Sequence, residues 1–94
     1  MSYYFEWDPE KAAVNLRKHG VPFKEATTVF GDPLAMNMPD PDHSLNEERF
    51  ILLGLSHQLR LLVVAYAERG MRTRLISARE AERQERRQYE EGKK

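Results

Sequence analysis

The 94-residue sequence has no cysteine, no long apolar run and no net charge. Without cysteine the chain can form neither a disulfide framework nor a thiolate metal site. Its longest apolar stretches, Phe50 to Leu55 and Leu61 to Ala67, are too short to cross a membrane. The first residues also lack the basic segment and apolar core of a signal peptide. We therefore expect a single cytoplasmic domain, residues 1–94, with one modest hydrophobic core.

The charges cancel in total but are segregated along the chain. Residues 32–48 contain five acidic side chains and no lysine or arginine, whereas residues 60–79 contain five arginines and one glutamate. Such a separation favours an anionic ligand at the basic pole. The guanidinium group of arginine suits phosphate because its planar fork donates two parallel hydrogen bonds.

Hydrophobic periodicity and turn residues predict an α+β fold: an antiparallel sheet of three to five strands with helices packed on one face. One helix is bounded by Asp8-Pro9 at its start and by Gly20 after its end. The expected strands are Tyr3–Trp7, Leu34–Met38, Arg49–Ser56, Arg60–Ala67 and Met71–Ile76, and the expected helices are Pro9–His19, Phe23–Phe30 and Ala78–Glu91. The expected buried residues are Trp7, Phe23, Phe30, Phe50, Leu52, Leu62, Val64 and Ile76.

The stretch from Met71 to Glu80 is predicted to be a strand that turns directly into the last helix. Ser77 and Glu80 have the spacing of a capping box, which marks a helix start. Arg72, Arg74 and Arg79 would then gather at a helix N-terminus, where phosphate binds well. The alternative is that these are surface arginines bonded to acidic neighbours.

Several segments resemble the BrnT family of toxins, over nearly the whole chain and in order. They are Phe5-Glu6-Trp7-Asp8-Pro9-Glu10-Lys11, Asn15-Leu16-Arg17-Lys18-His19-Gly20-Val21, Phe23-Lys24-Glu25-Ala26, Val29-Phe30-Gly31-Asp32-Pro33, Glu48-Arg49-Phe50, Leu61-Leu62-Val63-Val64 and Arg74-Leu75-Ile76-Ser77-Ala78-Arg79-Glu80-Ala81. The loop from Met38 to Asn46 departs from any pattern of that family. The resemblance implies a RelE-like fold and a toxin of a type II toxin–antitoxin pair that cleaves RNA and inhibits translation. It also implies a BrnA-like antitoxin, itself dimeric and DNA-binding, in a 2:2 complex that reaches operator DNA only through the antitoxin.

RNA cleavage without a metal needs an acid/base group and cations around the phosphate. Histidine is the side chain best suited to acid/base work near neutral pH, and His19 is the candidate. Each candidate also has a simpler role: His19 and Lys18 can end a polar helix, and Tyr89 can anchor the last helix instead of stacking on a base. The predicted catalytic residues are Lys18, His19, Arg74 and Arg79, and the predicted RNA-binding residues are Arg72, Arg83 and Tyr89.

No cofactor and no metal are expected. His43 with Asp40, Asp42, Glu47 and Glu48 matches no compact ligand motif, and acidic loops are usually solvated. A second function stays open, in which the same arginines bind nucleic acid or a protein without catalysis. The last helix is so polar that we expect it to lie at an interface with a partner.

Overall fold

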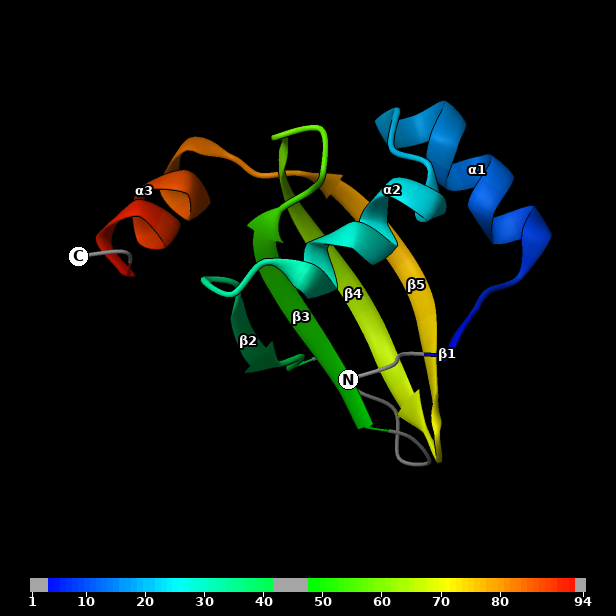
Figure 1. Cartoon of the computed structure of the whole chain (residues 1–94). Coiled ribbons are helices and arrows are strands. Elements are labelled where there is room, and N and C mark those ends of the chain that lie inside the picture. The colour runs from blue at the N-terminus through cyan, green and yellow to red at the C-terminus, as the bar shows by residue number, and fades with distance from the viewer. Residues whose placement is uncertain (1–3, 42–47, 93–94) are drawn as a thin grey trace.

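The computed structural model of the chain describes residues 4–41 and 48–92 (Figure 1). The elements are β1 (Tyr4–Glu6), α1 (Pro9–His19), α2 (Phe23–Thr28), the 3-10 turn η1 (Val29–Gly31), β2 (Met36–Pro39), β3 (Glu48–Leu55), β4 (Leu61–Arg69), β5 (Arg72–Glu80) and α3 (Arg83–Gly92). No helix among these residues is long and apolar enough to cross a membrane.

The local signals around α1 act as predicted. The carboxylate of Asp8 accepts a hydrogen bond from the backbone N–H of Glu10 at 2.8 Å, and Pro9 occupies the first turn. Gly20 ends the helix with φ 70, a left-handed conformation that costs glycine little.

The described strands form one sheet in the order β1-β5-β4-β3-β2. The pairs β2–β3, β3–β4 and β4–β5 are antiparallel, as the short connections predict. The sheet is nevertheless mixed, because β1 pairs in parallel with β5. The long chain segment between these two strands permits a parallel pair.

Both faces of the sheet are covered in part, each by different helices. On one face the side chains of Leu52, Leu62 and Val64 pack with residues of α2 such as Phe23. On the other face Leu53 and Val63 pack with Tyr89 of α3. The prediction that helices share one face therefore holds for α1 and α2, whereas α3 covers part of the opposite face.

The predicted core is mostly correct. Phe23, Leu52, Leu62 and Val64 are buried. The remaining four predicted core residues are partly buried, and three of them, Trp7, Phe30 and Phe50, pack against that core.

The predicted capping box at Ser77 is wrong, because β5 continues through it to Glu80. Pairing with the long strand β4 extends to the end of β5 and overrides the local helix signal. The reciprocal bond of a capping box forms farther along instead, where the backbone N–H of Glu82 donates to the carboxylate of Glu85 at 2.8 Å. Helix α3 therefore begins at Arg83, five residues later than predicted.

Candidate functional site

A bulge in β5 decides which way its arginines point. Ile76 has no partner on β4, although Leu75 before it and Ser77 after it both do. Side chains alternate along a strand, so one extra residue reverses the alternation beyond it. The side chain of Arg79 consequently lies on the same face of the sheet as that of Arg74. This face is opposite to the one that packs against α2.

We call this side, opposite to α2, the open face. Its rows follow the register of β5, β4 and β3: Arg79-Val63-Leu53, Ser77-Ala65-Ile51 and Arg74-Ala67-Arg49. Tyr89 of α3 packs on the first row. The open face thus alternates basic rows with a row of small and apolar side chains.

Glu6 of β1 holds three arginines at one end of the open face. Its carboxylate lies 3.3 Å from Arg72, 3.5 Å from Arg74 and 3.8 Å from Arg69. Hydrogen bonding from Arg72, and then from Arg74, lowers the pKa of the Glu6 carboxyl. The single negative charge of Glu6 cannot neutralise both Arg72 and Arg74, so this pair of arginines stays basic.

Arg79 forms a two-pronged ion pair with Glu85 of α3. The two terminal guanidinium nitrogens donate to the two carboxylate oxygens at 2.9 and 2.8 Å. This contact raises the pKa of Arg79 and lowers that of Glu85. Arg79 also donates to the carbonyl of Glu80 at 3.3 Å.

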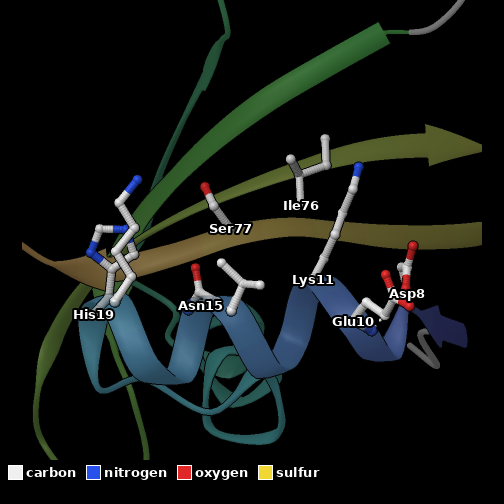
Figure 2. A pocket seen from close by; sticks show the side chains of 9 residues that line it. Asp8, Glu10, Lys11, Asn15, His19, Ile76 and Ser77 are labelled. Atoms are coloured by element: carbon white, nitrogen blue, oxygen red, sulfur yellow. Dashed lines mark hydrogen bonds between the residues drawn. The ribbon is translucent and has the colours of Figure 1, made fainter.

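Lys18 and His19 line a groove of about 360 Å³ between α1 and β5 (Figure 2). The other lining residues are Asp8, Glu10, Lys11, Val14, Asn15, Ile76 and Ser77. Since Ser77 also belongs to the open face, the groove borders that face along the part of β5 that lies beyond its pairing with β1. Figure 2 shows His19 at one end of the groove and Asp8 at the other.

Asn15 joins the two walls of the groove. It is 5% exposed, and its amide nitrogen donates to the carbonyl oxygens of Val21 at 3.0 Å and Ala78 at 2.8 Å. Its amide oxygen accepts from the backbone N–H of Ala78 at 3.0 Å. The side chain thus pairs with β5 as a neighbouring strand would, one residue before Arg79.

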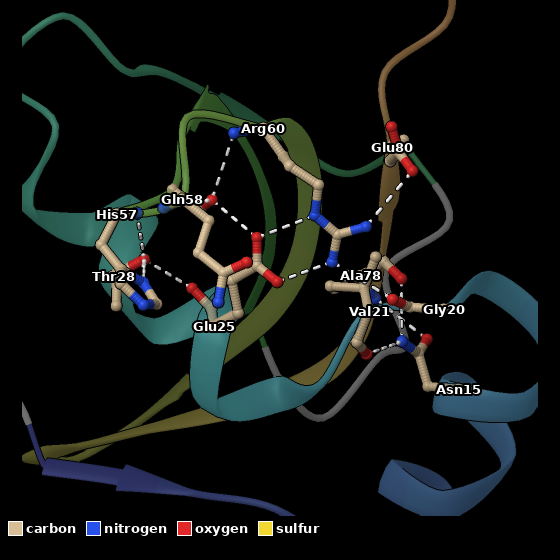
Figure 3. A network of polar contacts seen from close by, with 11 residues as sticks. Asn15, Gly20, Val21, Glu25, Thr28, His57, Gln58, Arg60, Ala78 and Glu80 are labelled. Atoms are coloured by element: carbon tan, nitrogen blue, oxygen red, sulfur yellow. Dashed lines mark hydrogen bonds and ion pairs between the residues drawn. The ribbon is translucent and has the colours of Figure 1, made fainter.

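Arg60 makes a second connection between the helices and β5, at the end of α1 that carries His19 (Figure 3). Its guanidinium donates to the buried carboxylate of Glu25 at 2.6 and 2.9 Å, to the carbonyl of Gly20 at 3.1 Å and to the carboxylate of Glu80 at 3.3 Å. The Arg60 contact lowers the pKa of Glu25. This network fixes the residue after His19 and the residue after Arg79.

The structure separates the predicted site residues into groups. Lys18 and His19 share the groove, Arg72 and Arg74 share Glu6, and Arg79 is paired with Glu85. All three arginines have acidic partners, which is the alternative that the sequence left open.

The two predicted RNA-binding residues of α3 lie elsewhere. Arg83 is exposed at the first position of that helix. Tyr89 is 3% exposed and its hydroxyl donates to Asp32 at 2.6 Å, so it anchors α3. A buried ring offers no face to a base while α3 stays docked.

Sequence reasoning missed Glu6, Asn15, Arg49 and Glu85 as parts of this region. Arg49 comes within 3.8 Å of Asp40 on the open face. Arg49 lies two residues before Ile51 on a central strand, so both side chains fall on one face of the sheet. That spacing was the available signal in the sequence. Among the described residues no group of three or more metal-ligating side chains comes together, and His43, Asp42 and Glu47 lie outside those residues.

Known proteins resemble this chain at the level of sequence family and of fold. The model of the family described as "Ribonuclease toxin, BrnT, of type II toxin-antitoxin system" matches residues 7–85. The fold is similar to the 1.1 Å crystal structure of the Brucella abortus ribonuclease toxin BrnT, with a TM-score of 0.68 and 22% sequence identity. That similarity covers 87% of this chain and 100% of the other. Comparison with curated proteins gives no match.

Proposed function

The chain belongs to the family of BrnT ribonuclease toxins of type II toxin–antitoxin systems, and we propose that it is a cytoplasmic, metal-independent endoribonuclease that inhibits translation. The observation that carries the site is the bulge at Ile76, which puts Arg79 on the open face with Arg74. The groove that holds Lys18 and His19 borders the same face at Ser77. We propose that the acid/base group of the groove and the cations of the open face act on one RNA strand that crosses their shared border at Ser77.

In the proposed reaction, the 2′-oxygen of a ribose attacks the adjacent phosphorus, and the bond from phosphorus to the 5′-oxygen of the next nucleotide breaks. The 2′-hydroxyl gives its proton to a base, and the leaving 5′-oxygen takes up a proton. The products are a 2′,3′-cyclic phosphate and a 5′-hydroxyl. His19 exchanges one of these protons, and Lys18, Arg74 and Arg79 stabilise the crowded phosphate.

Arg79 retains the capacity to bind phosphate despite its ion pair. A guanidinium group has five N–H donors. Glu85 and the carbonyl of Glu80 take three of them. The remaining donors can bind a phosphate oxygen, and Arg72 extends the basic surface for the flanking RNA.

The test is cleavage of RNA by the purified chain in excess chelator, with the ends of the products identified. We expect cyclic phosphate and 5′-hydroxyl ends, and a loss of at least about 100-fold in the Arg79→Ala variant, because removing one charge-stabilising donor costs that much. Arg17→Ala is the matched control, since Arg17 is exposed on α1 and does not line the groove.

A second candidate function is a non-catalytic module that binds nucleic acid or a protein through the same arginines. The ion pairs of Arg72, Arg74 and Arg79 favour it, because paired side chains are held in place without any substrate. Binding of RNA without cleavage, equally weakened by Arg74→Ala and Arg79→Ala, would establish this function and exclude the ribonuclease.

The family pairs its toxins with antitoxins. We propose that this antitoxin is BrnA-like, dimeric and DNA-binding, that it covers the open face, and that the complex contains two copies of each chain. Light scattering should show a mass for the co-expressed pair that fits two of each. An unchanged mass and unchanged nuclease activity beside the neighbouring gene product would contradict the complex. The alternative is a homodimer formed through α3, which the mass of the chain alone would reveal.

A further inference from the structure

A small cavity of about 120 Å³ lies on the open face beside Arg79. It is formed between the sheet and α3. Its floor consists of the apolar side chains Met38, Ile51, Leu53 and Val63, and its rim carries Arg79, Glu85 and Gln88. Met38 and Ile51 are only half-buried, so the floor is accessible from the open face.

The cavity combines an apolar floor with polar groups gathered on one side, the usual composition of a small-ligand site. A nucleobase is complementary to this cavity, since its faces are apolar and its edge carries hydrogen-bond donors and acceptors. The amide of Gln88 offers both a donor and an acceptor, and within residues 4–41 and 48–92 it has no hydrogen-bond partner.

The position of the cavity links it to the phosphate chemistry. Arg79 belongs both to the cavity rim and to the basic row of the open face. A nucleotide whose phosphate contacts Arg79 can therefore place its base over Ile51 and Val63. Glu85 is occupied by Arg79, which leaves Gln88 as the rim side chain able to contact the base edge.

We propose that this cavity is the subsite for one nucleobase of the RNA, next to the phosphate held by Arg79, and that Gln88 determines which base it prefers. The inference rests on the proposed ribonuclease function and gives that function a source of sequence preference. Gln88 acts on the choice of substrate and takes no part in bond cleavage.

The direct test is binding of the four nucleoside 5′-monophosphates, observed by nuclear magnetic resonance. We expect shifts of the methyl groups of Met38, Ile51 and Val63 and of the Gln88 amide, and inorganic phosphate alone should not shift the methyl groups. Equal shifts with phosphate alone, or none with any nucleotide, would overturn the subsite whether or not the chain cleaves RNA.

Cleavage mapping then tests the role of Gln88. Gln88→Ala should reduce the preference for the favoured base next to the cut by about three- to tenfold, the effect of one lost neutral hydrogen bond. Cleavage next to the favoured base should fall by that factor, and cleavage next to the other bases should stay at the parental rate, because those bases make no bond to Gln88. The matched control is Gln84→Ala, one turn earlier on α3, exposed and outside the cavity. An unchanged preference in Gln88→Ala would reject the inference while leaving the ribonuclease intact, whereas absence of cleavage by the wild type would reject the ribonuclease.

Discussion

Replacing Asn15 by alanine should separate α1 from β5 and weaken the whole domain. The change removes three hydrogen bonds, one to Val21 and two to Ala78. Each buried neutral hydrogen bond contributes roughly 0.5–1.5 kcal/mol, and water from the groove replaces part of the loss, so we expect a cost of about 2–4 kcal/mol. That is a large share of the roughly 5–15 kcal/mol that stabilises a typical domain.

Asn15→Asp gives a sharper version of the same test. The aspartate keeps an acceptor for the N–H of Ala78, but its charged form faces two carbonyl oxygens and cannot donate to them. Burial raises the folded-state pKa of such a carboxyl above its unfolded value. The folded state then binds more protons, so this variant should gain stability as the pH falls from 7 towards 5.

Urea denaturation at several pH values measures both variants. The control is Asn37→Ala, because Asn37 is exposed on β2, and such a surface change should stay within about 0.5 kcal/mol of the parent. If Asn15→Ala also stays within that range, the side chain does not join α1 to β5. If Asn15→Asp loses stability on acidification, the assignment of its buried partners is wrong.

Three further changes test other contacts. Glu85→Gln should free the charge of Arg79 and tighten RNA binding about threefold in fluorescence anisotropy, at a stability cost below about 1 kcal/mol; weaker binding would contradict the ion pair as a competitor of RNA. Glu25→Gln should cost about 2 kcal/mol at neutral pH, since it weakens the buried contact with Arg60. The lowered pKa of Glu25 means that its stabilisation is complete above the unfolded pKa of about 4.3 and is lost as the pH falls through the folded pKa, so variant and parent should converge in acid melts. Phe50→Ala should cost about 3 kcal/mol in thermal melts, because Phe50 stacks on Tyr66 and packs against the core, and an unchanged melting temperature would show that its face is assigned wrongly.

The sequence predicted the fold where local signals and hydrophobic pattern agree. Asp8, Pro9 and Gly20 set the bounds of α1, and the apolar strands β3 and β4 lie at the centre of the sheet. The signal failed at Ser77, where a capping box competes with strand pairing. A local pattern cannot report that β4 is long enough to hold β5 through Glu80.

The candidate site was predicted only in part, because its contacts depend on tertiary placement. Lys18 and His19 do share a groove, and the arginines of β5 do face one side. The bulge that turns Arg79 to that side leaves no signature in the alternation of residue types. Glu85 could not be assigned as its partner, because a continuous helix from Ala78 would have placed the two side chains on different faces.

We propose that His19 takes part in RNA cleavage. The most direct measurement is the single-turnover cleavage rate of RNA in excess chelator for His19→Ala beside His57→Ala. Removing an acid/base group should lower the rate by about 100- to 10,000-fold. His57 lies at the β3–β4 turn and contacts Thr28, so its variant should cleave at the parental rate. Equal rates for the two folded variants would contradict the account.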